Sequence, residues 1–236
     1  MTEFFVSAAI TVGIALPLAG VMSALVLPRL SPEYKARAHL CWGWQAFRGN
    51  RHQAALRQYD RAVEIDAENP RVYAARGGVK FLLNDFAGAS TDLNEAIRLA
   101  PGNTDILHVR AMARCRSGDF GGAVADFEKV LQLNPDAILP RNNFAWYLST
   151  LPEDTFRDGR RAVTLATEAC DLSGWRQADC LGTLSAAYAE CGKFVEALRL
   201  LERAITLDSN GENAKTRQRM LDAFHRSEPY RDMPSS

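Results

Sequence analysis

A residue pattern that recurs about every 34 residues is the strongest constraint on how this 236-residue chain folds. Alanines recur at intervals of 34, 34, 39 and 35 residues, at Ala55, Ala89, Ala123, Ala162 and Ala197. Seven residues later a second series repeats the same four intervals, at Ala62, Ala96, Val130, Ala169 and Ala204. Self-similarity with such a period indicates a solenoid, in which each unit buries its apolar face against its neighbours.

Each unit is predicted to be a pair of amphipathic helices. Three of the segments, NDFAGASTDLNEAIRLAP, GDFGGAVADFEKVLQLNP and GKFVEALRLLERAITLDS, share an aromatic residue three positions before the first alanine. Their apolar residues are spaced by three and four, and the helices are separated by turns containing Gly, Asn or Asp. Small alanines let paired helices approach closely, and Pro70, Pro101 and Pro135 end a helix before the next pair.

These residues resemble the tetratricopeptide repeat family, whose unit has small residues at three fixed positions and a proline near its end. The first position is filled here by Gly43, Gly77, Ala111, Ala145 and Ser185, and the proline is kept as Pro101 and Pro135. The resemblance covers roughly residues 36–207 and implies an all-α, right-handed α-solenoid of about five helical hairpins. The fourth unit, with five extra residues around 150–159, resembles an extended repeat that is common in bacterial proteins of the family.

The repeat intervals and the flanking composition predict the domain boundaries. The first hairpin departs from the pattern, with Gly49 one place early and Ala67 where the proline is expected. The residues after the last hairpin predict a helix that caps the stack, followed by a polar, disordered tail. The predicted divisions are a transmembrane anchor at 1–29, a linker at 30–35, hairpins at 36–69, 70–103, 104–137, 138–177 (extended) and 178–209, a capping helix at 210–227 and the tail at 228–236.

The predicted anchor is an uncharged run from Phe4 to Pro28, which would span about 37 Å as a helix. Arg29, Lys35 and Arg37 follow it and no basic residue precedes it, so the repeats are expected on the cytoplasmic side of a single-pass membrane protein. Small residues within the run predict close packing against another membrane helix, and they are Ala9, Gly13, Gly20 and Ala24. One alternative is a cleaved signal peptide and an exported, periplasmic protein in envelope assembly. The other is an apolar helix that packs on the rest of the chain.

Charge and composition do not favour catalysis, cofactors or nucleic acid. The chain has 28 basic and 28 acidic residues, which gives no electrostatic reason to bind nucleic acid. Five scattered cysteines and four scattered histidines show no metal-ligand spacing, and SGDFGGAV lacks the Gly-Lys-Ser/Thr ending of a phosphate loop. We therefore predict no enzyme activity, no cofactor, no metal and no small-molecule substrate.

The resemblance implies a concave groove lined by the first helix of each hairpin, where a partner protein's peptide or helix would bind. The residues it places there are mainly aromatic and cationic, which favours a partner segment with acidic character. Three alternatives remain: the aromatics are core residues, the arginines are solvated, and the asparagines satisfy helix ends. The predicted groove residues are Arg37, Trp44, Phe47, Arg48, Arg71, Phe81, His108, Met112, Asn142, Asn143 and Trp146.

The sequence as a whole thus predicts a membrane-anchored scaffold or adaptor for protein–protein interaction. One role that fits this interpretation is an accessory or assembly subunit of a membrane protein complex. An anchor would raise the local concentration of a captured partner near the bilayer.

Overall fold

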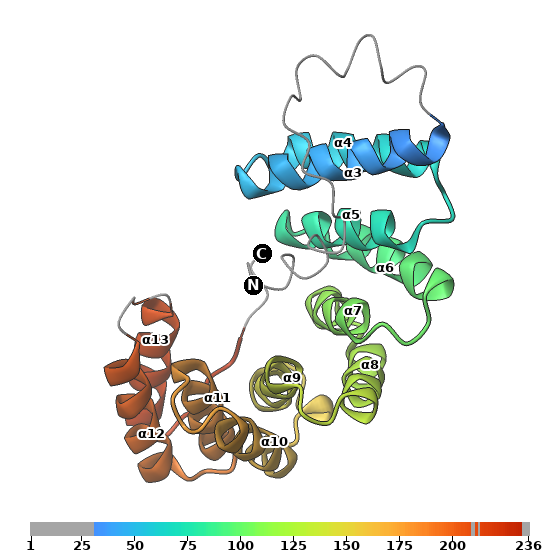
Figure 1. Cartoon of the computed structure of the whole chain (residues 1–236). Coiled ribbons are helices and arrows are strands. Elements are labelled where there is room, and N and C mark those ends of the chain that lie inside the picture. The colour runs from blue at the N-terminus through green and yellow to red at the C-terminus, as the bar shows by residue number, and fades with distance from the viewer. Residues whose placement is uncertain (1–30, 209–210, 212, 233–236) are drawn as a thin grey trace. The chain divides into compact units, whose positions relative to one another are not determined.

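A computed structural model describes residues 31–208, 211 and 213–232, and over these residues it contains eleven α-helices, one 3-10 helix and no strand (Figure 1). This confirms the predicted all-α class. The chain divides into two compact units, which we call unit 1 (to Asp119) and unit 2 (from Phe120). The helices are α3 (Pro32–Arg48), α4 (His52–Ile65), α5 (Pro70–Leu82), α6 (Phe86–Leu99), α7 (Thr104–Ser117), α8 (Phe120–Leu133), α9 (Ile138–Thr150), η2 (Asp154–Phe156), α10 (Gly159–Leu172), α11 (Ala178–Glu190), α12 (Phe194–Leu207) and α13 (Ala214–His225).

The predicted transmembrane anchor at 1–29, with Ala9, Gly13, Gly20 and Ala24, lies outside the described residues. Among the helices that the structure does describe, none combines the length and the apolar character needed to cross a bilayer. The anchor therefore stays a prediction from the sequence.

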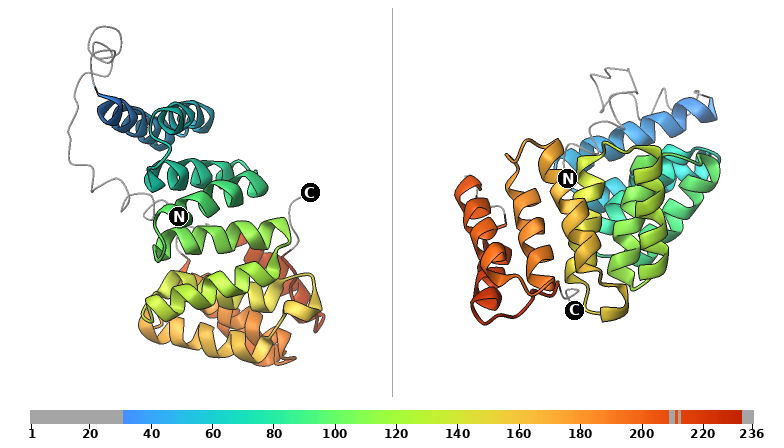
Figure 2. Two further views of the ribbon diagram at one scale, coloured as in Figure 1. Left: turned by 90° about the vertical axis from the view of Figure 1, so that its right-hand side faces the viewer. Right: turned by 90° about the horizontal axis from the view of Figure 1, so that it is seen from below.

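Unit 1 is built from helical hairpins that stack in chain order. Helix α3 packs on α4 and α5 packs on α6, and the hairpins are joined by packing of α4 on α5 and of α6 on α7. Helix α5 also contacts α7, so these two helices lie next to one another. Figure 2 shows the α3–α4 pair stacked on the α5–α6 pair.

Unit 2 follows the same packing rule. Helix α9 pairs with α10 and α11 pairs with α12, while α10 packs on α11 and α9 also packs on α11. Helix α8 packs against α9, where the rings of Phe127 and Phe144 stack with centroids 5.1 Å apart. Helix α13 packs against α12 and α11, where the sequence predicts a capping helix.

Both alanine series lie in the interior, as the hairpin interpretation requires. Every member of the two series is at most 1% exposed. At Gly43 the packing is closer still, because an added Cβ would lie 2.3 Å from a ring carbon of Tyr59. The recurring small residues are therefore the places where paired helices touch, and a larger side chain there would push the pair apart.

Short polar residues set the helix starts. The side chain of Asn69 accepts a hydrogen bond from the backbone N–H of Arg71, and Asp85 accepts one from Gly88. These bonds satisfy donors that have no partner in the first turn of a helix. Helix α7 ends at Ser117 and is followed by Gly118, whose φ of 87° is a left-handed conformation that glycine adopts without steric cost.

The extra residues of the fourth hairpin form an ordered connection between α9 and α10. It contains η2, and the ring of Phe156 packs 5.3 Å from that of Phe120. The guanidinium of Arg157 donates to the carbonyl oxygens of Leu151 and Pro152. The insertion therefore packs against the rest of unit 2 and holds the end of α9 in place.

Helix α13 carries a buried arginine on the face that meets the last hairpin. Arg217 is 4% exposed and forms ion pairs with Asp179 and Asp208. Burial lowers its pKa, although the charge of Asp179 opposes that effect. The cap is thus held by charge pairing as well as by Met220 and Phe224, which lie in an apolar cluster with Leu201.

Candidate protein-interaction surface

The predicted groove residues of α3 divide between core and surface. Phe47 packs against the cluster formed by Ala46, Ala55, Tyr59 and Val79. Trp44 is half-buried, and its ring stacks on that of Phe47 with centroids 5.7 Å apart. Stacking on a buried ring holds the tryptophan while leaving part of it accessible to a partner.

The cations of unit 1 differ in exposure. Arg37 is half-buried beside Cys41, whose pKa is raised by burial and lowered to a smaller extent by that guanidinium. Arg48 and Arg71 are exposed. Within the described part of the chain, no hydrogen bond or ion pair occupies either of these two guanidinium groups, so both can pair with a partner's carboxylate.

The predicted groove residues of α5 and α7 differ in burial: His108 is buried, whereas Phe81 and Met112 are half-buried. Phe81 and Met112 pack against the cluster that includes Leu93 and Ile106, and Phe81 also meets the ring of Phe86 at 5.5 Å. His108 is only 1% exposed, and burial lowers its pKa to about 4. Its assignment to the groove is corrected here, because a buried neutral imidazole offers no contact surface.

Helix α9 carries the three predicted groove residues of unit 2. Asn142 is 7% exposed, so it too presents almost no surface, and its Oδ1 has no hydrogen-bond partner among the described residues. Asn143 and Trp146 are half-buried. Asn142 and Trp146 are four residues apart and therefore lie on one face of the helix.

The last described residues of the chain bind to this face of α9. The ring of Tyr230 lies 5.8 Å from that of Trp146, and the Trp146 indole N–H donates to the Asp232 carboxylate over 3.1 Å. The backbone N–H of Asp232 donates to the Thr150 carbonyl over 2.9 Å. We call Tyr230–Asp232 the docked segment. The predicted disorder of the tail is wrong for these residues, because specific contacts hold them.

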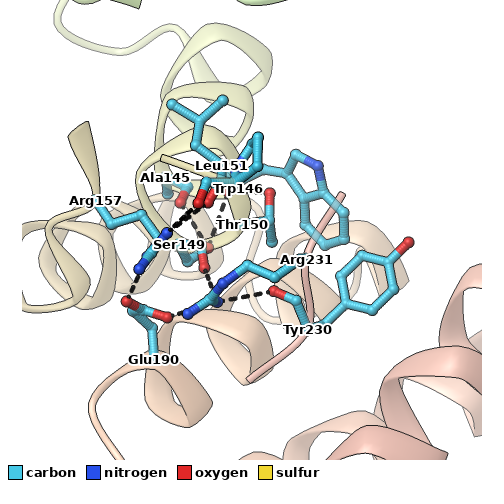
Figure 3. Close-up of polar contacts among 10 residues, drawn as sticks. Ala145, Trp146, Ser149, Thr150, Leu151, Arg157, Glu190, Tyr230 and Arg231 are labelled. Carbon is cyan, nitrogen blue, oxygen red and sulfur yellow. Dashed lines mark hydrogen bonds and ion pairs between the residues drawn. The ribbon is translucent and has the colours of Figure 1, made fainter. Parts of the chain in front are cut away.

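Arg231, in the middle of the docked segment, pairs with a carboxylate of the neighbouring helix (Figure 3). Its Nη1 lies 2.7 Å from the Glu190 carboxylate at the end of α11 and 3.5 Å from the Ser149 carbonyl oxygen. Glu190 also accepts from Arg157 over 2.9 Å, and its side chain is only 14% exposed. A shielded carboxylate between two cations is a strong recognition element for an arginine.

Four residues of this site were not predicted from the sequence, namely Tyr230, Arg231, Asp232 and Glu190. A tyrosine and an arginine in the polar stretch SEPYRDMPSS were the only available signal, and three residues carry no periodicity. Glu190 lies at a helix end, where a glutamate is normally solvated. Only the packing of α9 on α11 brings these groups together.

The potential metal ligands and the cysteines are the remaining groups that can carry chemistry. No group of three potential metal ligands among His, Cys, Asp and Glu occurs in the described ranges. Burial raises the pKa of all five thiols, to about 12 for Cys170, so none is an activated nucleophile. Cys115, Cys170 and Cys180 are buried, in agreement with packing cysteines, whereas Cys191 is exposed.

Comparison with known proteins identifies the repeat. Residues 177–207 match a family model described as tetratricopeptide repeat. No curated protein sequence matches the chain. Among solved structures, YrrB, described as a TPR protein with an unusual peptide-binding site, is 19% identical with a TM-score of 0.62, and the match covers 83% of this chain and 99% of YrrB.

Two further solved structures agree. TTC0263, a thermophilic TPR protein of Thermus thermophilus, is 17% identical with a TM-score of 0.59, and the match covers 81% of this chain and 98% of TTC0263. A MamA fragment from Desulfovibrio magneticus RS-1 is 14% identical with a TM-score of 0.64, covering 75% of this chain and 97% of the fragment. The chain therefore has the fold of tetratricopeptide repeat proteins. The match to the tetratricopeptide repeat model is confined to residues 177–207.

Proposed function

We propose that this protein is a protein-interaction scaffold whose first-helix faces bind a segment of a partner. One observation carries the proposal: a short non-helical segment, Tyr230–Asp232, is already bound on the α9 face, through side chains and through the backbone. A surface that holds one extended segment has the chemistry to hold another. Helix α3 supports the same function, because Trp44 and Arg48 leave surface for a partner.

The comparisons support this proposal at the level of fold. The tetratricopeptide fold is generally a non-enzymatic scaffold for protein interaction, and YrrB is described as having a peptide-binding site. The aromatic and cationic side chains of this chain favour a partner segment with acidic character at α3, since exposed guanidinium groups pair with carboxylates.

Partner capture by variants tests the proposal. The full-length chain is purified from membranes in mild detergent, and the amount of co-purified partner is compared with that of Trp44→Ala and Trp146→Ala. Each variant should weaken capture more than it lowers the melting temperature. Trp175→Ala is the matched control, since Trp175 follows α10 and packs beside Arg203, away from the first-helix faces. Full capture by both variants with lowered melting temperatures would assign both tryptophans to the core and contradict the proposal.

We further propose that residues 1–29 anchor the scaffold in a membrane as a single span, with the repeats in the cytoplasm. The support is the uncharged run from Phe4 to Pro28 and the basic residues that follow it. Carbonate washing of separated membranes tests the anchor, because release of the full-length chain would contradict it. N-terminal sequencing distinguishes the exported alternative, in which the mature chain begins after a cleaved signal peptide.

An accessory or assembly role in a membrane complex follows from the same proposal. An anchored scaffold meets its partners at the bilayer, where tethering raises their effective concentration. Cross-linking in intact cells, followed by identification of the captured proteins, tests this role: membrane subunits are expected, and capture of soluble proteins alone would contradict it.

A further inference from the structure

The contacts of Tyr230–Asp232 with α9 and α11 indicate which kind of segment binds to this surface of unit 2. Resting on the scaffold function, we propose that the docked segment is an internal competitor that occupies a peptide site. The partner it excludes presents the same chemistry, namely an aromatic residue, an arginine and an acidic residue in consecutive positions of an extended chain.

The site distinguishes the three side chains. The aromatic ring packs on Trp146 and lies against the apolar cluster of α11 to α13, which includes Ala186, Met220 and Phe224. The acidic side chain accepts from the Trp146 indole N–H. The arginine reaches the shielded Glu190 carboxylate over 2.7 Å. A segment with a different order of residues would leave that carboxylate without its second cation.

The backbone contacts explain why an extended segment binds at this place. Thr150 is the last residue of α9, so its carbonyl has no partner within the helix, and it accepts from the Asp232 backbone N–H. The guanidinium of Arg231 also lies beside the Ser149 carbonyl (Figure 3). A cation and an N–H donor are what the negative end of a helix favours. These contacts are available to any chain that follows the same path.

The docked segment is tethered, and this makes it a competitor. Helix α13 ends at His225, only a few residues before Tyr230. A short tether gives an effective concentration on the order of millimolar, so a free segment of equal intrinsic affinity must exceed that concentration to displace it. Removing or releasing the docked segment should therefore increase the affinity of the site for a free segment, although no new contact is added.

A peptide added in trans tests the inference. The probe is the synthetic peptide SEPYRDMPSS, residues 227–236, labelled for fluorescence anisotropy. The receptor is the chain shortened to end at Pro229, which keeps the hydrogen bond from the Glu228 backbone to Ala223 at the end of α13. We expect the shortened chain to bind the probe at least about tenfold more tightly than the intact chain does. A probe with glutamate in place of the arginine should not bind.

A full-length variant provides the second measurement. Arg231→Glu places a carboxylate against Glu190 and should release the docked segment, so that the variant binds the unaltered probe as tightly as the shortened chain. Arg226→Glu is the matched control, because Arg226 pairs with the exposed Glu228 and not with α9 or α11. If shortening lowers the helical circular dichroism, the Arg231→Glu variant decides the question alone.

Three results would overturn the inference: no binding of the probe by folded receptor, equal binding by the intact and released chains, or an intact chain that dimerises through its tail and so assigns the site to a second copy. The probe requires unit 2 and no partner, so its failure would contradict the internal competitor and remove the support that the docked segment gives to the scaffold function. The scaffold function is judged separately, by partner capture with the tryptophan variants.

Discussion

Gly43→Ala and Gly182→Ala should change stability in opposite directions, although both replace a helical glycine by the best helix former. Alanine in place of glycine within a helix gains up to about 1 kcal/mol from backbone entropy. At Gly43 the new Cβ would lie 2.3, 2.6 and 2.9 Å from three ring carbons of Tyr59, which is 3% exposed and held within an apolar cluster. At Gly182 the nearest atom is the Arg217 Nε at 4.0 Å, an ordinary contact.

The overlap at Gly43 requires the two helices to separate or the ring to move. Overpacking of this kind costs about 1–3 kcal/mol, and a buried ring favours the upper part of that range. Subtraction of the helix gain leaves a net loss of about 1–2 kcal/mol for Gly43→Ala, against a gain of up to about 1 kcal/mol for Gly182→Ala. Urea unfolding followed by helical circular dichroism measures both. Stabilisation by both substitutions would refute the claim that α3 and α4 touch at this glycine.

Two further predictions concern buried charge. Asp92→Ala should cost about 3 kcal/mol of unfolding free energy, because the partly buried Arg76 loses a bidentate ion pair of 2.7 and 2.8 Å. Asp60→Ala, at the half-exposed partner of the same arginine, should cost less than about 1 kcal/mol. Equal urea midpoints for the two variants would contradict this ranking. Burial lowers the pKa of His108 to about 4 from 6.5, so the folded state resists a proton that the unfolded chain accepts. The contribution of His108 to stability should be nearly constant above about pH 7 and fall by about 2 kcal/mol between pH 7 and pH 5. In His108→Leu this contribution should be absent. If urea unfolding shows the same loss of stability between pH 7 and pH 5 in this variant, other groups cause the pH dependence.

The sequence contained enough information for the hairpins, because their packing repeats. Ala89 and Ala96 recur in register in the other hairpins and are buried, and a period of 34 residues can be recognised without knowing any contact. Helix starts at Asn69 and Asp85 are local as well, since a capping residue and its donor lie within three positions of each other.

The composition of the groove was harder to predict, because the helical period does not show which residues the next hairpin covers. Phe81 and Met112 repeat at positions that face a partner in the family, yet here they pack on the core of unit 1. Asp92 lies in α6, the second helix of its hairpin, and its buried side chain pairs with Arg76 and Lys80 of α5. Such pairings depend on which side chains meet across two helices.

The docked segment could not be predicted from the sequence at all. Tyr230, Arg231 and Asp232 lie in a short polar tail that lacks apolar periodicity, and their partners Trp146 and Glu190 are distant in the chain. Recognition here needs the end of α9, the end of α11 and the tail in one place. Only the folded unit provides that arrangement.

Hydrogen–deuterium exchange on the chain that ends at Pro229, with and without the peptide SEPYRDMPSS, tests whether unit 2 carries a peptide site. The peptide should slow exchange in the last turns of α9 and α11, around Thr150 and Glu190, and leave α4 and α6 unchanged. Unaltered exchange at these helix ends in the presence of bound peptide, or protection confined to other helices, would show that the first-helix face of unit 2 is not a peptide site.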